Sequence, residues 1–181
     1  MEQQFQYYAF ISYKREDEKW AKWLQDRLRW YKLPSKLCRQ ITRLPKKVWP
    51  VFRDNTDLDS GRLEENIRHE LERSHYLIVI CSPEAARSPW VGKEVKYFAT
   101  LHGADKIIPF VVSGIPYSND IETECIHEQI KAISQEELLA INVREEGIGS
   151  FAMKKKRAFI RVVARLLDIK FNTLWQPYER I

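Results

Sequence analysis

The chain has 181 residues, a length that fits one compact domain, since typical domains hold roughly 100 to 150 residues. Hydrophobic residues make up 44% of the chain and charged residues 30%, which excludes a disordered protein. The net charge is +5, but acids are interleaved with the basic residues, and only Lys154-Lys155-Lys156-Arg157 forms a basic block. Such a block is typical of a solvated helix face, so nucleic acid is not an expected partner.

The cysteines and the amino terminus indicate a cytoplasmic protein. Cys38, Cys81 and Cys125 are odd in number, widely spaced and without a CxxC pair, which argues against a disulfide framework and a structural zinc site. The four histidines are scattered, so no metal site is predicted. The first residues lack a secretion signal and the apolar runs are only strand-length, so no membrane span is expected.

The first third of the chain predicts a strand, a helix and an edge strand. Tyr7 to Tyr13 is aromatic and β-branched, and the polar residues 14–17 after it can cap a helix. That helix has an apolar stripe and ends at Pro34; the stripe consists of Trp20, Trp23, Leu24, Leu28 and Tyr31. Val48 to Arg53 predicts a second strand, which Pro50 places at an edge of the sheet.

The middle of the chain predicts the central strand. A second helix is indicated by a set of spaced positions, namely Leu63, Ile67, Glu70, Leu71 and Ser74. Tyr76 to Cys81 is a continuous apolar run, typical of a strand covered on both faces. Pro89 starts a third helix that extends to about Thr100, and Ile107 to Val112 predicts another buried strand.

The last third predicts weaker elements and one long helix. We expect a short helix from Glu124 to Ile133 and a short strand from Leu138 to Asn142. The long helix starts at Phe151 and lies across the sheet, with apolar positions at Phe159, Val162, Val163, Leu166 and Leu167. Alternating strands and helices predict a flavodoxin-like α/β three-layer sandwich with a central parallel five-stranded sheet. The predicted domain is 1–167, and 168–181 is a tail that can join another module.

The predicted loops after Ser12, Arg53 and Ser82 lie at the carboxyl edge of the sheet, where such sheets bind ligands. The segment 12–15 offers a hydroxyl, an aromatic face and two cations, a set that can bind a ribose, a base and a pyrophosphate. Alternatively, the strand simply ends in polar residues. The segment 53–61 suits a loop that rearranges on assembly or a plain turn, in which Arg53 and Asp54 hold each other.

The segment 88–95 opens a helix in which Trp90 and Glu94 are four residues apart and share one face. This pairing suits a pocket that stacks a flat heterocycle beside a carboxylate that stabilises positive charge. We expect the two side chains to line an accessible cavity into which residues of the first strand project. A glutamate on a helix is otherwise most often exposed and inert.

Taken together, residues 7–15, 53–61 and 90–94 resemble a Toll/interleukin-1 receptor (TIR) domain of the bacterial, NAD-consuming type. The resemblance covers about Tyr7 to Val112, and the chain departs from shorter members between Trp30 and Val48 and in its tail. It implies that Glu94 is catalytic and that Trp90 lines the nicotinamide pocket. The other expected substrate-binding residues are Phe10, Ser12, Tyr13, Lys14, Arg15, Arg53 and Ser82.

The resemblance implies an NAD⁺ glycohydrolase or cyclase that releases nicotinamide and forms ADP-ribose or a cyclic isomer. NAD⁺ is then the substrate, with no separate cofactor, and the protein is an immune (anti-phage) or signalling effector activated by self-association with other TIR domains. The alternative is a noncatalytic TIR adaptor that signals through homotypic contacts. A phosphoacceptor or nucleotide sensor would need clustered acids where this chain has Ser12, Tyr13 and Lys14. The motifs GxGxxG, GxxxxGK[ST], HExxH and GxSxG are missing from the sequence.

Overall fold

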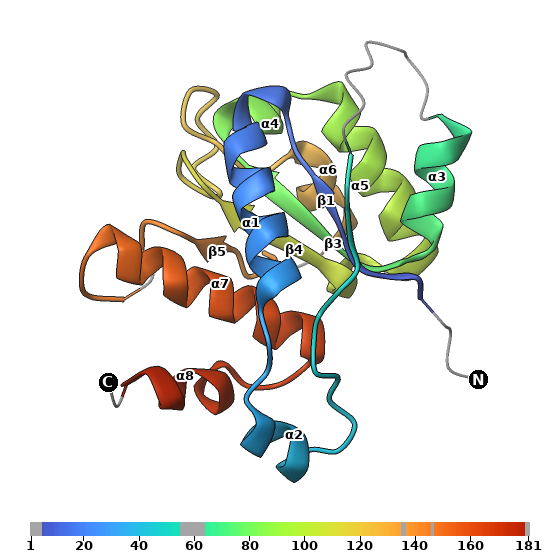
Figure 1. Ribbon diagram of the computed structural model, residues 1–181. Coiled ribbons are helices and arrows are strands. Elements are labelled where there is room, and N and C mark those ends of the chain that lie inside the picture. The colour runs from blue at the N-terminus through green and yellow to red at the C-terminus, as the bar shows by residue number, and fades with distance from the viewer. Residues whose placement is uncertain (1–4, 55–63, 135–136, 146, 180–181) are drawn as a thin grey trace.

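A parallel five-stranded sheet in the order β2-β1-β3-β4-β5 forms the centre of the structure (Figure 1). The computed structural model describes residues 5–54, 64–134, 137–145 and 147–179. Its strands are β1 (Tyr7–Ser12), β2 (Val51–Arg53), β3 (Ser74–Cys81), β4 (Ile107–Val111) and β5 (Ile141–Asn142). The expected fold class is therefore confirmed, with the predicted apolar run at the central strand and β2 at an edge.

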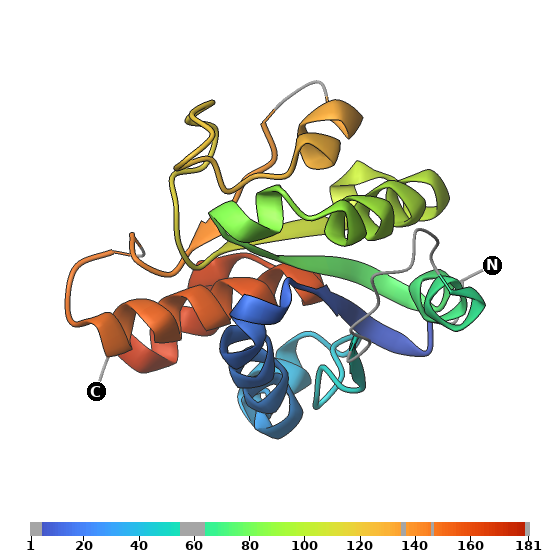
Figure 2. The same ribbon diagram turned by 90° about the horizontal axis from the view of Figure 1, so that it is seen from above.

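Helices cover both faces of the sheet, which gives three layers (Figure 2). One face carries α4 (Pro83–Ala86), α5 (Pro89–His102) and α6 (Glu128–Ile133), and α3 (Glu65–Glu72) packs beside α5. The opposite face carries α1 (Glu18–Trp30) and α7 (Phe151–Leu167). The shorter α2 (Ser35–Gln40) and α8 (Phe171–Glu179) lie below these two in Figure 1. No helix among the described residues is long and apolar enough to cross a bilayer.

Alternating residues of the strands feed two separate cores. In β1, Ala9 and Ile11 belong to the cluster that packs against α1 and α7, whereas Phe10 belongs to the cluster under α5. This alternation follows from the two-residue period of a strand, which sends successive side chains to opposite faces. The same rule decides, farther along β1 and β2, which polar side chains meet which helix.

Several element boundaries differ from those the sequence predicts. Strand β2 starts at Val51 rather than Val48, because Pro50 has no N–H for the ladder and only its carbonyl accepts a hydrogen bond, from Tyr8. Ser74 begins β3 instead of ending a helix, and its hydroxyl donates to the carbonyl of Glu70. The fourth helix, predicted from Glu124, starts at Glu128. Helices α2, α4 and α8 were not predicted.

The predicted tail packs onto the domain. Leu174 and Trp175 of α8 are buried in the same cluster as α7. The guanidinium groups of Arg157 and Arg161 on α7 lie 5.3 Å and 4.1 Å from the ring centroids of Trp175 and Phe171. Residues 168–175 therefore continue the packing of residues 5–167, and a role for the tail as a junction to another module stays a prediction.

The basic block on α7 is not a fully solvated face. The ammonium of Lys155 lies 5.4 Å and 4.9 Å from the ring centroids of Trp20 and Trp23 on α1. Arg157 is engaged with Trp175, as described above, and also donates to the carbonyl of Ile148. Aromatic contacts thus hold part of this charge against the protein.

Candidate active site

The amino-terminal turn of α5 fixes the positions of Trp90 and Glu94. The Ser88 hydroxyl accepts a hydrogen bond from the Val91 N–H at 3.2 Å, and Pro89 occupies the first helical position. Both features are favoured at helix starts, because Ser satisfies an otherwise unpaired donor and Pro has none to lose. The indole and the carboxyl are therefore presented one turn apart on a firmly started helix.

The register of β1 and the edge strand β2 brings Ser12 and Asp54 to the same end of the sheet. Ile11 of β1 pairs with Arg53 of β2, so the next residues in each strand direction are Ser12 and Asp54. Both side chains turn towards α5, where they meet Glu94 and Trp90. This cluster of Ser12, Asp54, Trp90 and Glu94 is called the α5-face cluster below.

Two hydrogen bonds connect the α5-face cluster. The Ser12 hydroxyl donates to Glu94 Oε1 at 2.9 Å, and the Trp90 indole N–H donates to Asp54 Oδ2 at 3.0 Å. Glu94 has 0% of its surface exposed and Asp54 has 6%. Among the described residues, no group meets hydrogen-bond geometry with Glu94 Oε2.

This environment favours the protonated form of Glu94. Burial raises the pKa of its carboxyl well above the usual value, and the negative charge of Asp54 and a hydrogen-bonding contact with Asp54 raise the pKa further. The hydrogen bond from Ser12 opposes these effects by lowering the pKa. The first and largest cause is the removal of the carboxyl from water.

The expectation of an accessible cavity is wrong for this structure. Trp90 and Glu94 do lie with Ser12 of the first strand, but Glu94 has no exposed surface, and Trp90 is half-buried. The sequence identified the shared helix face and the approach of the first strand to it, but not the packing of Asp54 against it. A ligand of the size of a dinucleotide reaches Glu94 only after neighbouring side chains move.

Tyr13 and Arg53 belong to the opposite face of the sheet. Arg53 Nε donates to Gln25 Oε1 on α1 at 2.9 Å, and Arg53 Nη1 donates to the Tyr13 hydroxyl at 2.9 Å. Its guanidinium also lies 3.8 Å from Glu18. The hypothesis that Arg53 and Asp54 hold each other is therefore wrong, because consecutive strand residues point to opposite faces.

The remaining expected substrate-binding residues lie outside the α5-face cluster. Phe10 is fully buried in the core beneath α5. Ser82 is also fully buried, where its hydroxyl donates to Asp17 Oδ2 at 2.5 Å and accepts from Ala85 N–H as the cap of α4. Lys14 is half-buried and Arg15 exposed in the turn before α1. The roles of these residues in binding stay predictions, and residues 55–61 of the predicted mobile loop lie outside the described residues.

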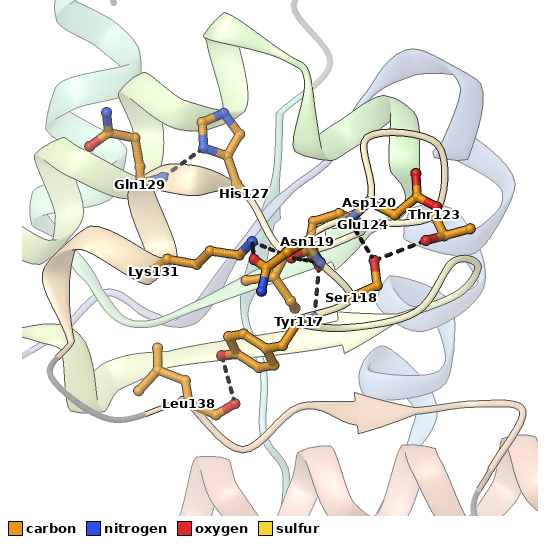
Figure 3. Close-up of polar contacts among 11 residues, drawn as sticks. Tyr117, Ser118, Asn119, Asp120, Thr123, Glu124, His127, Gln129, Lys131 and Leu138 are labelled. Carbon is orange, nitrogen blue, oxygen red and sulfur yellow. Dashed lines mark hydrogen bonds and ion pairs between the residues drawn. The ribbon is translucent and has the colours of Figure 1, made fainter.

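His127 supports the helix that carries Trp90 and Glu94, a contact the sequence did not reveal. Its Nε2 lies 2.9 Å from the Ser88 carbonyl, and its Nδ1 accepts from the Gln129 N–H at 3.0 Å (Figure 3). The ring is therefore neutral with the proton on Nε2, and burial lowers its pKa. Gly92 makes room for it, because a Cβ at this position would lie 2.5 Å from His127 Cε1.

Glu124 holds the loop between β4 and α6 at the same edge of the sheet. Its carboxylate accepts from the backbone N–H groups of Tyr117 and Ile126 and pairs with the ammonium of Lys131 (Figure 3). Lys131 also donates to Asn119 Oδ1 at 3.1 Å. These contacts satisfy the Glu124 carboxylate within its own loop.

Asp54 is the cluster residue that sequence reasoning missed. The signal that predicts it is the two-residue period of the strands: if Ser12 faces α5, then Asp54 beside it does as well. Within the described ranges, no group of three or more His, Cys, Asp or Glu side chains comes together.

Comparison with known proteins agrees with this architecture. A TIR domain family profile matches residues 9–137, a range that includes every member of the α5-face cluster. The NAD(+) hydrolase ApTIR of Actinoplanes sp. is 36% identical over 110 residues. That match covers 60% of this chain and 14% of the relative, so the chain spans only a small part of that protein.

A solved structure shows the same fold. The TIR domains of the activated Roq1 resistosome directly recognizing the pathogen effector XopQ superpose with a TM-score of 0.55. The match covers 85% of this chain and 98% of that chain at 14% sequence identity, so the likeness concerns the fold alone. With a parallel sheet in this strand order and a family profile that matches most of its length, the chain belongs to the TIR domain family.

Proposed function

We propose that this TIR domain cleaves the bond between nicotinamide and ribose in NAD⁺ and that Glu94 is its catalytic carboxylate. The observation that carries the proposal is the placement of Glu94, fully buried at the carboxyl edge with a hydrogen bond from Ser12 and a second acid, Asp54, beside it. Burying such a group costs on the order of a few kcal/mol of stability. An apolar residue would pack there without that cost, so a functional role accounts for the acid better than packing does.

The chemistry needs one carboxylate. Nicotinamide leaves as a neutral molecule from a cationic precursor, so no acid has to protonate it, and positive charge develops on the ribose. An ionised Glu94 would stabilise that charge and accept hydrogen bonds from the ribose hydroxyls. Attack by water on the ribose carbon then gives ADP-ribose and a proton, whereas attack by a nitrogen of the adenine gives a cyclic product.

Trp90 is proposed to line the nicotinamide pocket. Its indole lies one helical turn before Glu94, and its N–H is bonded to Asp54. A half-buried indole offers a flat face on which an aromatic ring stacks at low entropic cost. The similarity to the NAD(+) hydrolase ApTIR, which includes a 110-residue match at 36% identity, supports the same substrate.

Self-association is the proposed trigger. Because Glu94 has no exposed surface in the single chain, some event has to open the site before NAD⁺ enters. Binding of a second TIR domain supplies free energy for such a change by favouring the open form. The expected signature is a specific activity that rises with protein concentration.

The test is release of nicotinamide from NAD⁺ by the purified protein across a range of protein concentrations, followed by chromatography. Glu94→Gln keeps the shape and removes the charge, and we expect it to reduce the rate by about 10²- to 10³-fold. Glu65→Gln, which changes an exposed acid on α3, is the matched control and should leave the rate unchanged. Equal rates for wild type and Glu94→Gln would overturn the proposal.

A noncatalytic adaptor is the alternative outcome of the same experiment. The burial of Glu94 is compatible with an adaptor, since a domain that only binds other TIR domains does not need an exposed carboxylate. Folded wild-type protein that associates and releases no nicotinamide at any concentration would establish the adaptor.

A further inference from the structure

We propose that Asp54 is a positioning residue that latches the candidate active site closed, because it binds the Trp90 indole and lies against Glu94, and that it has to leave both before substrate enters. The inference rests on the proposed function for its catalytic consequence. The contacts among Asp54, Trp90 and Glu94 do not depend on that function. Asp54 directly follows β2, and its two partners belong to α5, so the latch ties the end of the edge strand to the helix.

One hydrogen bond and the strand register together place Asp54 at the turn of α5 that carries Trp90 and Glu94. Its Oδ2 accepts the Trp90 N–H at 3.0 Å, which fixes the indole in one orientation. The β1–β2 register places Asp54 beside Ser12, whose hydroxyl is bonded to Glu94, so both carboxyl groups converge on the same turn of α5. With 6% of Asp54 and 0% of Glu94 exposed, water does not separate the two groups well.

Two buried carboxylates in contact do not both ionise readily, because like charges repel strongly away from water. The contact with Asp54 accordingly adds to burial in raising the pKa of Glu94. A protonated Glu94 cannot stabilise positive charge on a ribose. The latch therefore has two effects. It holds the Trp90 indole in the closed position, and it keeps a proton on Glu94.

Other charged groups on the elements around Glu94 have partners of their own. On β2, Arg53 turns to α1, and on α3, Arg68 lies over the Tyr97 ring. On α6, His127 bonds to the Ser88 carbonyl and Lys131 pairs with Glu124. On α5 itself, Lys93 is half-buried and also has an interaction partner. Asp54 is therefore the charged neighbour that acts on the pKa of Glu94.

Opening the latch involves a single proton. When Asp54 moves away and water reaches Glu94, the O–H bond of the carboxyl breaks and the proton passes to water. The electron pair stays on Glu94, which becomes the carboxylate that catalysis needs. Site opening and charging of the catalytic group are thus one coupled event.

The substitution Asp54→Asn separates charge from shape. Asparagine keeps an oxygen for the Trp90 N–H and removes the negative charge, whereas Trp90→Phe keeps an aromatic ring and removes the donor. Asp26→Asn, an exposed acid on α1, is the matched control. We expect Asp54→Asn to lower the pKa of Glu94 and Asp26→Asn to leave it unchanged.

The first readout does not depend on activity: the stability of each protein is compared with its Glu94→Gln counterpart between pH 5 and pH 9 by urea unfolding. A raised pKa in the folded state means that wild type loses stability relative to Glu94→Gln as pH rises from the unfolded value through the folded one. The limiting slope is about tenfold in the folding equilibrium constant per pH unit. In the Asp54→Asn background this loss should end at a lower pH.

The second readout is nicotinamide release as a function of pH. We expect Asp54→Asn to shift the acidic limb of the rate profile to lower pH and to raise the rate of dilute protein several-fold, with a smaller gain for Trp90→Phe. An unchanged stability profile and an unchanged acidic limb in Asp54→Asn would overturn the latch. Shifted stability without any nicotinamide release, even from wild type, would overturn the proposed function and leave the contact of Asp54 with Glu94 supported.

Discussion

The two faces of the sheet at its carboxyl edge treat charge in opposite ways. On the α1 face, Arg53 is surrounded by an amide, a hydroxyl and the acid Glu18, so its charge is matched and partly solvated. On the α5 face, Asp54 and Glu94 are both buried acids, and they accept hydrogen bonds from the neutral donors Trp90 and Ser12, respectively.

This difference indicates which face of the sheet can change its protonation state when the packing changes. A matched ion pair in contact with water gains little from rearrangement, whereas a buried acid beside a second acid is poised to change its protonation when the packing changes. The α5 face is thus the part of the edge that responds to opening. The α1 face supports the edge of the sheet, and its charges stay the same when the site opens.

The largest expected effect on the α5 face comes from Gly92, the position at which His127 packs against α5. Gly92→Ala would place a Cβ 2.5 Å from His127 Cε1 and 2.8 Å from its Nε2. We expect a loss of about 3 kcal/mol in the free energy of unfolding, because overpacking forces the helix or the ring to shift. Urea unfolding measures it, with Lys96→Ala, an exposed change on the same helix, as control.

A second substitution shows whether the clash is the cause. In a His127→Ala background, Gly92→Ala should cost much less than in wild type, since the atoms it strikes are gone. Equal costs in the two backgrounds would contradict the contact.

Ser12→Ala should lower the free energy of unfolding by an amount that depends on pH, unlike changes on the α1 face. The Ser12 hydrogen bond lowers the pKa of Glu94, so its removal raises further a pKa that is already raised. A raised folded-state pKa gives stability below the unfolded value that is lost as pH rises, so the variant should fall behind wild type increasingly above the folded pKa of wild type. We expect about 2 kcal/mol at the alkaline end and less in acid. Ser35→Ala, at an exposed serine, should show a flat difference.

Arg53→Lys tests the support on the α1 face. Lysine cannot reproduce the two hydrogen bonds to Gln25 and Tyr13, so we expect a loss of about 1 kcal/mol that does not vary between pH 5 and pH 9. The same urea titrations measure it. A marked pH dependence like that of Ser12→Ala would show that the two faces are not independent.

Glu18→Gln should have the smallest effect. The Glu18 side chain is 45% exposed and lies 3.3 Å from Lys22 and 3.8 Å from Arg53. Exposed ion pairs contribute little, so the change in unfolding free energy should stay within about 0.5 kcal/mol, and salt should reduce it further. A loss well above that value would mean that Glu18 is essential for holding Arg53.

The sequence predicted the architecture well because apolar patterning decides it. The run from Tyr76 to Cys81 identified the central strand, and Pro50 identified an edge strand. Short elements such as α4 escaped prediction, since four residues carry no periodic signal. The helix α8 escaped because its burial depends on tertiary packing, including contacts of its aromatic rings with arginines of the preceding helix α7.

The site was predicted in part, for a physical reason. Residues four apart on a helix share a face, so Trp90 and Glu94 were placed together from the sequence, and the structure places them together with Ser12. Residues at one strand end were grouped without regard to the two-residue period, which separates Tyr13 and Arg53 from Ser12 and Asp54. Burial of Glu94 depends on side-chain packing across three elements, which local sequence does not encode.

The most direct test of the central claim, that the buried acid of the α5 face acts on NAD⁺, is the initial rate of nicotinamide production at high protein concentration. Wild type should be active and Glu94→Gln inactive by comparison. Both proteins should unfold cooperatively, and the variant should be at least as stable as wild type above neutral pH, so unfolding would not explain its lower rate. Undiminished nicotinamide production by the Glu94→Gln protein would contradict the account.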